Sequence, residues 1–113
     1  MKKTHICKKV LRKAFTENDT AYAAFPLMSV VVEQNSKKTN GNTAFNQRVT
    51  IVADADKALI DLLQIPQTFK LTTDQGATIV LGDADYKLRL LATEGEVSPV
   101  KLVFERNSPN AAF

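Results

Sequence analysis

The amino-acid sequence predicts a mainly β fold: a small antiparallel β-sandwich or partly open barrel of about six strands, with one short internal helix and a basic N-terminal amphipathic helix or arm. Three observations carry this prediction. Short runs of alternating apolar and polar residues recur between residues 27 and 105. Turn-forming residues separate these runs. One stretch, residues 54–64, has helical periodicity instead.

The first residues of the chain are strongly basic. Six of the 15 basic residues fall within residues 1–13, which hold no acid, so the rest of the chain carries nine basic and 12 acidic groups. Such a charge split favours contact between the basic segment and a polyanion or an acidic neighbour. The six candidate contact residues are Lys2, Lys3, Lys8, Lys9, Arg12 and Lys13.

The apolar residues of this segment have a spacing that predicts a helix. Doublets at Ile6-Cys7, Val10-Leu11 and Ala14-Phe15 recur about every four residues, with cations between them. Thr4 is a candidate N-cap. We therefore expect residues 1–18 to form a basic helix or arm whose apolar side packs on this domain or on another copy.

A long hairpin is expected after residue 26. Residues 27–33 are compact and β-branched, and residues 43–52 alternate. Four side chains of the second run share one face: Phe45, Gln47, Val49 and Ile51. The polar loop between the runs contains Asn40-Gly41, a pair that favours positive φ. Lys37 and Lys38 make this tip basic and a second candidate contact for a partner or nucleic acid.

Residues 54–64 predict a helix of about three turns. Asp54 is the expected cap, Asp56 lies in the first turn where the helix dipole favours an anion, and Pro66 ends the helix. The expected buried stripe consists of Ala58, Leu59, Leu62 and Leu63.

The remainder reads as a meander. Alternating runs at residues 68–72, 77–81, 86–91 and 100–105 are separated by turns that contain glycine. Residues 107–113 are expected to form an extended arm with an apolar end. We accordingly divide the chain into a basic helix or arm at residues 1–18, a β-rich domain at residues 19–106 and a C-terminal arm at residues 107–113.

No catalytic signature accompanies these elements. His5 and Cys7 are two positions apart, so on a helix they point in different directions and form no dyad. The Asp-Ala-Asp triplets at residues 54–56 and 83–85 are read as a helix start and a turn, since both lack the other ligands of a Ca²⁺ loop. We expect a non-enzymatic protein with no catalytic, cofactor-binding or metal-binding residues and no cofactor.

The composition also bears on compartment and membrane contact. Cys7 is the single cysteine, which excludes an intrachain disulfide and favours a reducing compartment. No apolar run approaches the ~20 residues of a membrane span, and no apolar stretch follows the N-terminal lysines as in a signal peptide. The basic segment has a narrow apolar side with one aromatic residue, so we expect no membrane partner.

The second half of the chain resembles a known class of proteins in the order of its elements. A strand at residues 49–52 leads to a helix at 56–63, a strand pair at 69–72 and 78–82, a further strand pair and a short apolar arm at 110–113. This order resembles small structural proteins of tailed bacteriophages, of the kind found in the tail or at the head–tail junction. The resemblance implies a virion protein, made in the cytoplasm of a bacterial host.

The leading hypothesis is therefore a non-enzymatic structural subunit of a phage-like virion. It assembles with copies of itself through its N-terminal, hairpin and C-terminal arms, and with adjoining virion proteins. Five apolar residues are the candidate subunit-docking contacts: Ile6, Val10, Leu11, Phe15 and Phe113. The alternative is a small nucleic-acid-binding β-barrel protein that uses the basic N-terminal helix for phosphate contacts. Under either hypothesis the basic segment meets DNA or a neighbouring subunit.

Overall fold

The computed structural model describes residues 2–14, 22–24, 27–54, 56–82, 85–94 and 99–109. Two candidate docking residues, Phe15 and Phe113, and most of the expected C-terminal arm lie outside these ranges. The elements in chain order are β1 (Lys2–Ala14), β2 (Ala23–Ala24), β3 (Leu27–Thr39), β4 (Asn42–Ala53), α1 (Lys57–Leu62), β5 (Gln67–Thr73), β6 (Thr78–Leu81), β7 (Arg89–Glu94) and β8 (Val100–Ser108).

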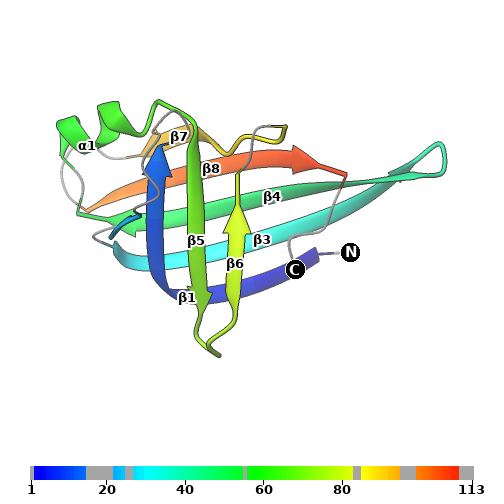
Figure 1. Ribbon diagram of the computed structural model, residues 1–113, viewed down its shortest axis with the longest axis horizontal. Helices are drawn as coiled ribbons and strands as arrows, with labels where there is room; N and C mark the ends of the chain where they lie inside the picture. The colour runs from blue at the N-terminus through cyan, green and yellow to red at the C-terminus, as the bar shows by residue number, and fades with distance from the viewer. Residues whose placement is uncertain are drawn as a thin grey trace.

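The strands form one antiparallel sheet that curls into a half-barrel (Figure 1). Seven strands follow the order β6-β5-β1-β3-β4-β8-β7, and the short β2 pairs with β1 beside this path. Strands β5 and β6 cross in front of β3, β4 and β8 in Figure 1. The backbone N–H of Gln67 donates to the carbonyl of Leu88 at 3.0 Å, which links the start of β5 to the residue before β7. The prediction of a mainly β fold with one short helix is confirmed.

The N-terminal segment is the main correction to the predicted fold. Lys2–Ala14 forms strand β1 and no helix, and this strand lies inside the sheet. Its first half, from Lys2 to Cys7, pairs with β3, and its second half, from Cys7 to Ala14, pairs with β5. Figure 1 shows β1 turning from the direction of β3 to the direction of β5. The described sheet therefore has more strands than the six expected, and residues 2–14 belong to the β domain.

A β-bulge explains why this strand has helix-like spacing. The register against β5 shifts between Cys7 and Lys9, so Lys8 is an extra residue without a partner in the ladder. Because of this extra residue, two consecutive inward-pointing side chains are three positions apart instead of two. Cys7 and Val10 are therefore both buried. In a sequence, apolar residues three apart are normally taken as a helical face. The bulge also supplies the local bend at which β1 changes partners.

Strands β3 and β4 form the long hairpin that the sequence predicts. Their register runs from Leu27 opposite Ala53 to Thr39 opposite Asn42, so the expected polar loop is mostly strand. The turn itself is Asn40-Gly41, with φ of 51° and 82°. Positive φ at both central residues is the requirement of a type I′ turn, which matches the twist of the flanking strands. The hairpin is the longest projection in Figure 1.

The helix is shorter than predicted and has a different cap. Asp56, not Asp54, is the N-cap of α1: its Oδ1 accepts from the Leu59 backbone N–H at 2.9 Å. Leu63, at the C-cap, is fully buried, and Leu59 packs against the core. Ala58 is exposed, so it does not belong to the buried stripe. The helix covers one end of the curled sheet (Figure 1).

The core fills the concave side of the sheet. Inward positions alternate along the regular strands, as in β8, where Val100, Leu102 and Phe104 are buried and Lys101 is exposed. The hydrophobic cluster consists of Cys7, Val10, Val30, Val32, Val49, Ile51, Ala53, Leu63, Phe69, Leu71, Ile79, Leu81, Leu88, Val100, Leu102 and Phe104. The inward face becomes polar toward the end of the barrel from which the hairpin projects.

Candidate functional sites

The projecting end of the β3–β4 hairpin is the first candidate site. The pairing of β1 with β3 ends at Lys2 opposite Asn35, and that of β8 with β4 ends at Ser108 opposite Phe45. Within the described chain, residues 37–44 therefore pair in the sheet ladder only with one another, as a two-stranded ribbon with open edges. Lys37 and Lys38 are exposed on this ribbon, which we call the projecting ribbon (residues 37–44).

Two adjoining cavities lie at the base of the projecting ribbon. The larger, of about 460 Å³, is lined by Tyr86, Lys87, Arg89, Glu105 and Arg106, among others. The smaller, of about 390 Å³, is mostly apolar and is lined by Asn42, Thr43, Ala44, Tyr86, Asn107, Ser108 and Pro109. Tyr86 and Asn107 border both cavities. Their sizes fall in the range of small-molecule pockets, and the charges around the larger one have both signs.

A buried polar chain crosses the sheet at this end. The Arg106 Nε donates to Gln47 Oε1 at 2.8 Å, and the Gln47 Nε2 donates to Gln34 Oε1 at 2.8 Å. Arg106 is 8% exposed and Gln47 is fully buried. The guanidinium also donates to the Tyr86 carbonyl at 3.5 Å, which ties β8 to the segment before β7. Removing one of these acceptors is costly, because a desolvated charged donor then loses a hydrogen bond.

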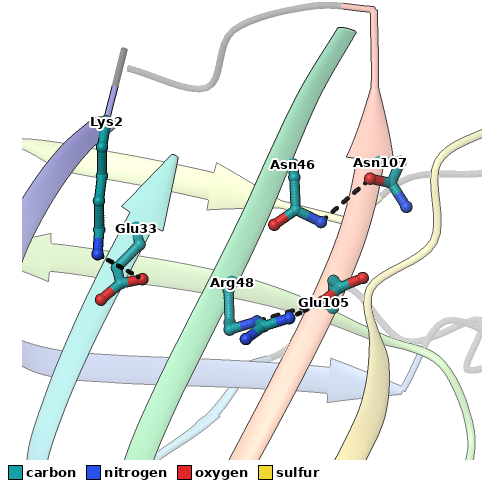
Figure 2. A network of polar contacts seen from close by, with 6 residues as sticks. All are labelled: Lys2, Glu33, Asn46, Arg48, Glu105 and Asn107. Carbon is teal, nitrogen blue, oxygen red and sulfur yellow. Dashed lines mark hydrogen bonds and ion pairs between the residues drawn. The ribbon is translucent and has the colours of Figure 1, made fainter. Parts of the chain in front are cut away.

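The convex side of the same strands carries a row of polar contacts (Figure 2). Arg48 stands between Glu33 and Glu105 in the sheet register and binds Glu105, with a shortest distance of 2.6 Å. Asn46 Nδ2 donates to Asn107 Oδ1 at 3.1 Å. Lys2 Nζ lies 3.5 Å from Glu33 Oε2, so one of the predicted contact cations has an intramolecular partner. Pairs this exposed add little stability, and they chiefly favour one cross-strand arrangement.

Strand formation separates the predicted basic residues into groups. Opposite residues in a ladder share a face, so Lys3, which faces Gln34, and Arg12, which faces Phe69, lie on the inward side. Lys9 and Lys13 lie on the outward side with Lys2, and Lys8 is the exposed bulge residue. The structure therefore does not form the single basic face that a helix would have.

The predicted docking residues are also separated. Val10 is 1% exposed and belongs to the core, whereas Ile6 is 62% exposed on the outward side. Leu11 is half-buried on the outward side, opposite Lys70. Lys70 and Tyr22 were not predicted as site residues, because no local pattern links two residues so far apart in the chain. Lys70 Nζ lies 4.7 Å from the centroid of the Tyr22 ring.

His5 and Cys7 lie on the same side of β1, because residues two apart on a strand point the same way. The expectation that these two side chains point in different directions is therefore wrong. Cys7 is nonetheless a buried thiol in an apolar setting: burial raises its pKa above the ordinary value of 9.0, and the charge of Asp74 raises that pKa further. A thiol that resists ionisation is a weak nucleophile, so Cys7 acts as a small core residue.

Among the described residues, no cluster of three or more histidine, cysteine, aspartate or glutamate side chains is placed to hold a metal ion. In that same part of the chain, no helix combines the length and the apolar character needed to cross a membrane. Comparison with protein-family models, with curated proteins and with solved structures found no match to this chain.

Proposed function

We propose that this chain is a non-enzymatic structural subunit of a phage-like virion, in the tail or at the head–tail junction. It assembles with copies of itself and with adjoining virion proteins, in a particle made in the cytoplasm of a bacterial host. The observation that supports this proposal best is the projecting ribbon. An isolated two-stranded ribbon is marginally stable in water, and open strand edges pair readily with another chain. A neighbouring subunit would supply the missing partner.

The two end strands of the sheet support assembly independently. β6 and β7 terminate the sheet order, and each carries a large exposed apolar residue: Val80 is 51% exposed and Leu91 is 57% exposed. A contact between the β6 edge of one copy and the β7 edge of the next would bury both residues. Such a contact joins two different surfaces, so repeating it forms a ring when the rotation closes. Ring assemblies of this kind suit a tail or a connector.

A ribbon-shortened variant tests the proposal. Lys37 pairs with Ala44 and Lys38 pairs with Thr43, so deleting these four residues removes two rungs and keeps the turn and the inward and outward faces. The native mass of the wild-type and shortened proteins is measured by light scattering over a range of concentrations and salt. We expect a discrete multimer for the wild type and a smaller species, with an unchanged unfolding midpoint, for the variant.

The matched control replaces Lys37 and Lys38 by glutamine, which removes the ribbon's charge and keeps its length. This control should assemble like the wild type if backbone pairing holds the contact. A wild-type protein that stays monomeric at every concentration, alone and with lysate of phage-infected cells, would overturn the proposal. Nucleic-acid binding, the second candidate, loses the helix on which it was based, so it requires a different surface.

A further inference from the structure

The outward face shared by β1 and β5 gathers three lysines that the sequence places far apart. Lys9 stands opposite Thr72, Leu11 opposite Lys70, and Lys13 opposite Thr68. Alternate residues of a strand share a face, so Lys9 and Lys13 flank the rung that carries Lys70. The opposite face of the same strands holds Val10, Leu71 and Phe69 in the core. We call the outward set Lys9, Lys13 and Lys70 the lysine face.

The lysine face has no carboxylate partner among the described residues. Two other lysines on the convex surface are paired across strands, Lys2 with Glu33 and Lys101 with Glu94. The residues opposite Lys9 and Lys13 are threonines, and the residue opposite Lys70 is a leucine. Exposed Lys8 adjoins the face at the bulge. Among the residues that the structure describes, this surface therefore has a local excess of positive charge.

The position of Lys70 is constrained as well. Its ammonium lies over the Tyr22 ring, 4.7 Å from the centroid, so a cation–π contact holds it above the sheet. Lys9 and Lys13 are four residues apart, a span of about 13 Å along a strand. A row of cations over this length matches an extended polyanion better than a single small anion.

We propose that the lysine face binds the phosphate backbone of nucleic acid without regard to base sequence. Lysine ammonium groups and the Thr72 hydroxyl are donors to phosphate oxygens, and such contacts position a nucleic acid without reading its bases. The Tyr22 ring already packs against Lys70, so this ring is not free to act as a stacking platform of the single-strand-binding type. This function is independent of subunit assembly.

The test is a salt titration of binding to two labelled probes, an oligo(dT) strand and a duplex of equal length. The variant Lys9→Gln/Lys13→Gln/Lys70→Gln is compared with the wild type. The matched control Lys2→Gln/Lys57→Gln/Lys101→Gln removes the same charge from other parts of the surface. If all three lysines contact phosphates, the slope of log Kobs against log salt for the duplex should become shallower by about 2.7 in the variant.

The expected result is that the wild type and the control bind both probes with similar slopes, and that the lysine-face variant loses most of its affinity at low salt. Equal slopes for the variant and the wild type, or an equal loss in the control, would overturn the proposal. Binding of the wild type to anionic vesicles but to neither probe would overturn it in favour of a lipid surface. A changed native mass of the variant with unchanged probe binding would show a subunit contact instead. Circular dichroism and the unfolding midpoint verify that each variant is folded.

Discussion

Phe69 on β5 and Phe104 on β8 meet edge to face, with ring centroids 4.7 Å apart and planes inclined by 70°. Both side chains are fully buried. β5 and β8 are not neighbours in the sheet, so this contact spans the concave side and joins the two halves of the curl. The Phe69–Phe104 contact therefore helps to hold the half-barrel in its curled form.

Truncating either ring should destabilise the fold strongly. We expect Phe104→Ala to lower the free energy of unfolding by about 3–5 kcal/mol, because it removes buried apolar area and leaves a cavity. A double-mutant cycle of Phe69→Leu and Phe104→Leu, measured by urea denaturation, should give a coupling of about 0.5–1.5 kcal/mol. Additive effects in this cycle would contradict an aromatic contribution beyond burial.

Gly82 is required where the chain passes close to the start of β5. Its φ is 100°, and a Cβ at this position would lie 2.3 Å from the Gln67 carbonyl oxygen. We expect Gly82→Ala to lower the unfolding midpoint far more than Gly76→Ala. Gly76 has a φ of 92° but no atom within 4 Å of the Cβ position, so alanine there costs about 1–2 kcal/mol from backbone strain alone. Equal decreases in the thermal unfolding midpoint of the two variants would show that the close approach of Gly82 to Gln67 does not affect stability.

The buried polar chain should be sensitive to loss of its central residue. Gln47→Leu removes the acceptor of Arg106 and the donor to Gln34 while keeping a similar volume. We expect a loss of about 2–4 kcal/mol, because a charged donor and a neutral acceptor lose these partners inside the protein. The control is Asn46→Leu on the exposed side of the same strand, which should change stability by less than about 1 kcal/mol. Chemical denaturation of both variants measures the difference.

Cys7 predicts a pH dependence of stability in the alkaline range. Burial and the charge of Asp74 raise the pKa of Cys7 in the folded state, so above pH 9.0, its ordinary pKa, the unfolded chain binds fewer protons than the folded one. The contribution of this thiol to the free energy of unfolding is therefore fully present below its pKa in the unfolded chain. It declines as the pH rises toward its pKa in the folded protein. The difference in unfolding free energy between the wild type and Cys7→Ala should shrink over this interval. A constant difference from pH 7 to pH 11 would contradict this expectation.

Strands β4, β5, β6 and β8 could be predicted because each has one more buried and one more exposed face. Val49 and Ile51 follow the period of two, and Asn40-Gly41 fixes the hairpin turn by its positive φ. Strand β1 could not be predicted in this way. The unpaired Lys8 gives the buried residues a spacing of three, and local spacing cannot distinguish a bulged strand from a helix.

The candidate sites depended on pairings that are not local in the sequence. Lys9 and Lys13 could be named as contact residues, but Lys70 joins them only through the register of β5. One feature of the sequence pointed to the buried polar chain. Gln47 shares a face with Val49 and Ile51, where an apolar residue is expected. A polar residue at an inward position needs a partner, and the partner on β8 becomes evident only from the sheet order.

The exchange of partners along β1 has a consequence for biosynthesis. β1 is the first strand of the sheet to leave the ribosome, yet the partner of its second half, β5, ends at Thr73. At about 5–20 residues per second, the second half of β1 waits several seconds for β5 to be synthesised. An apolar strand would be prone to aggregation during this interval, whereas lysines on an exposed strand oppose it. We therefore expect the basic residues of β1 to oppose aggregation of the nascent chain until the sheet can close.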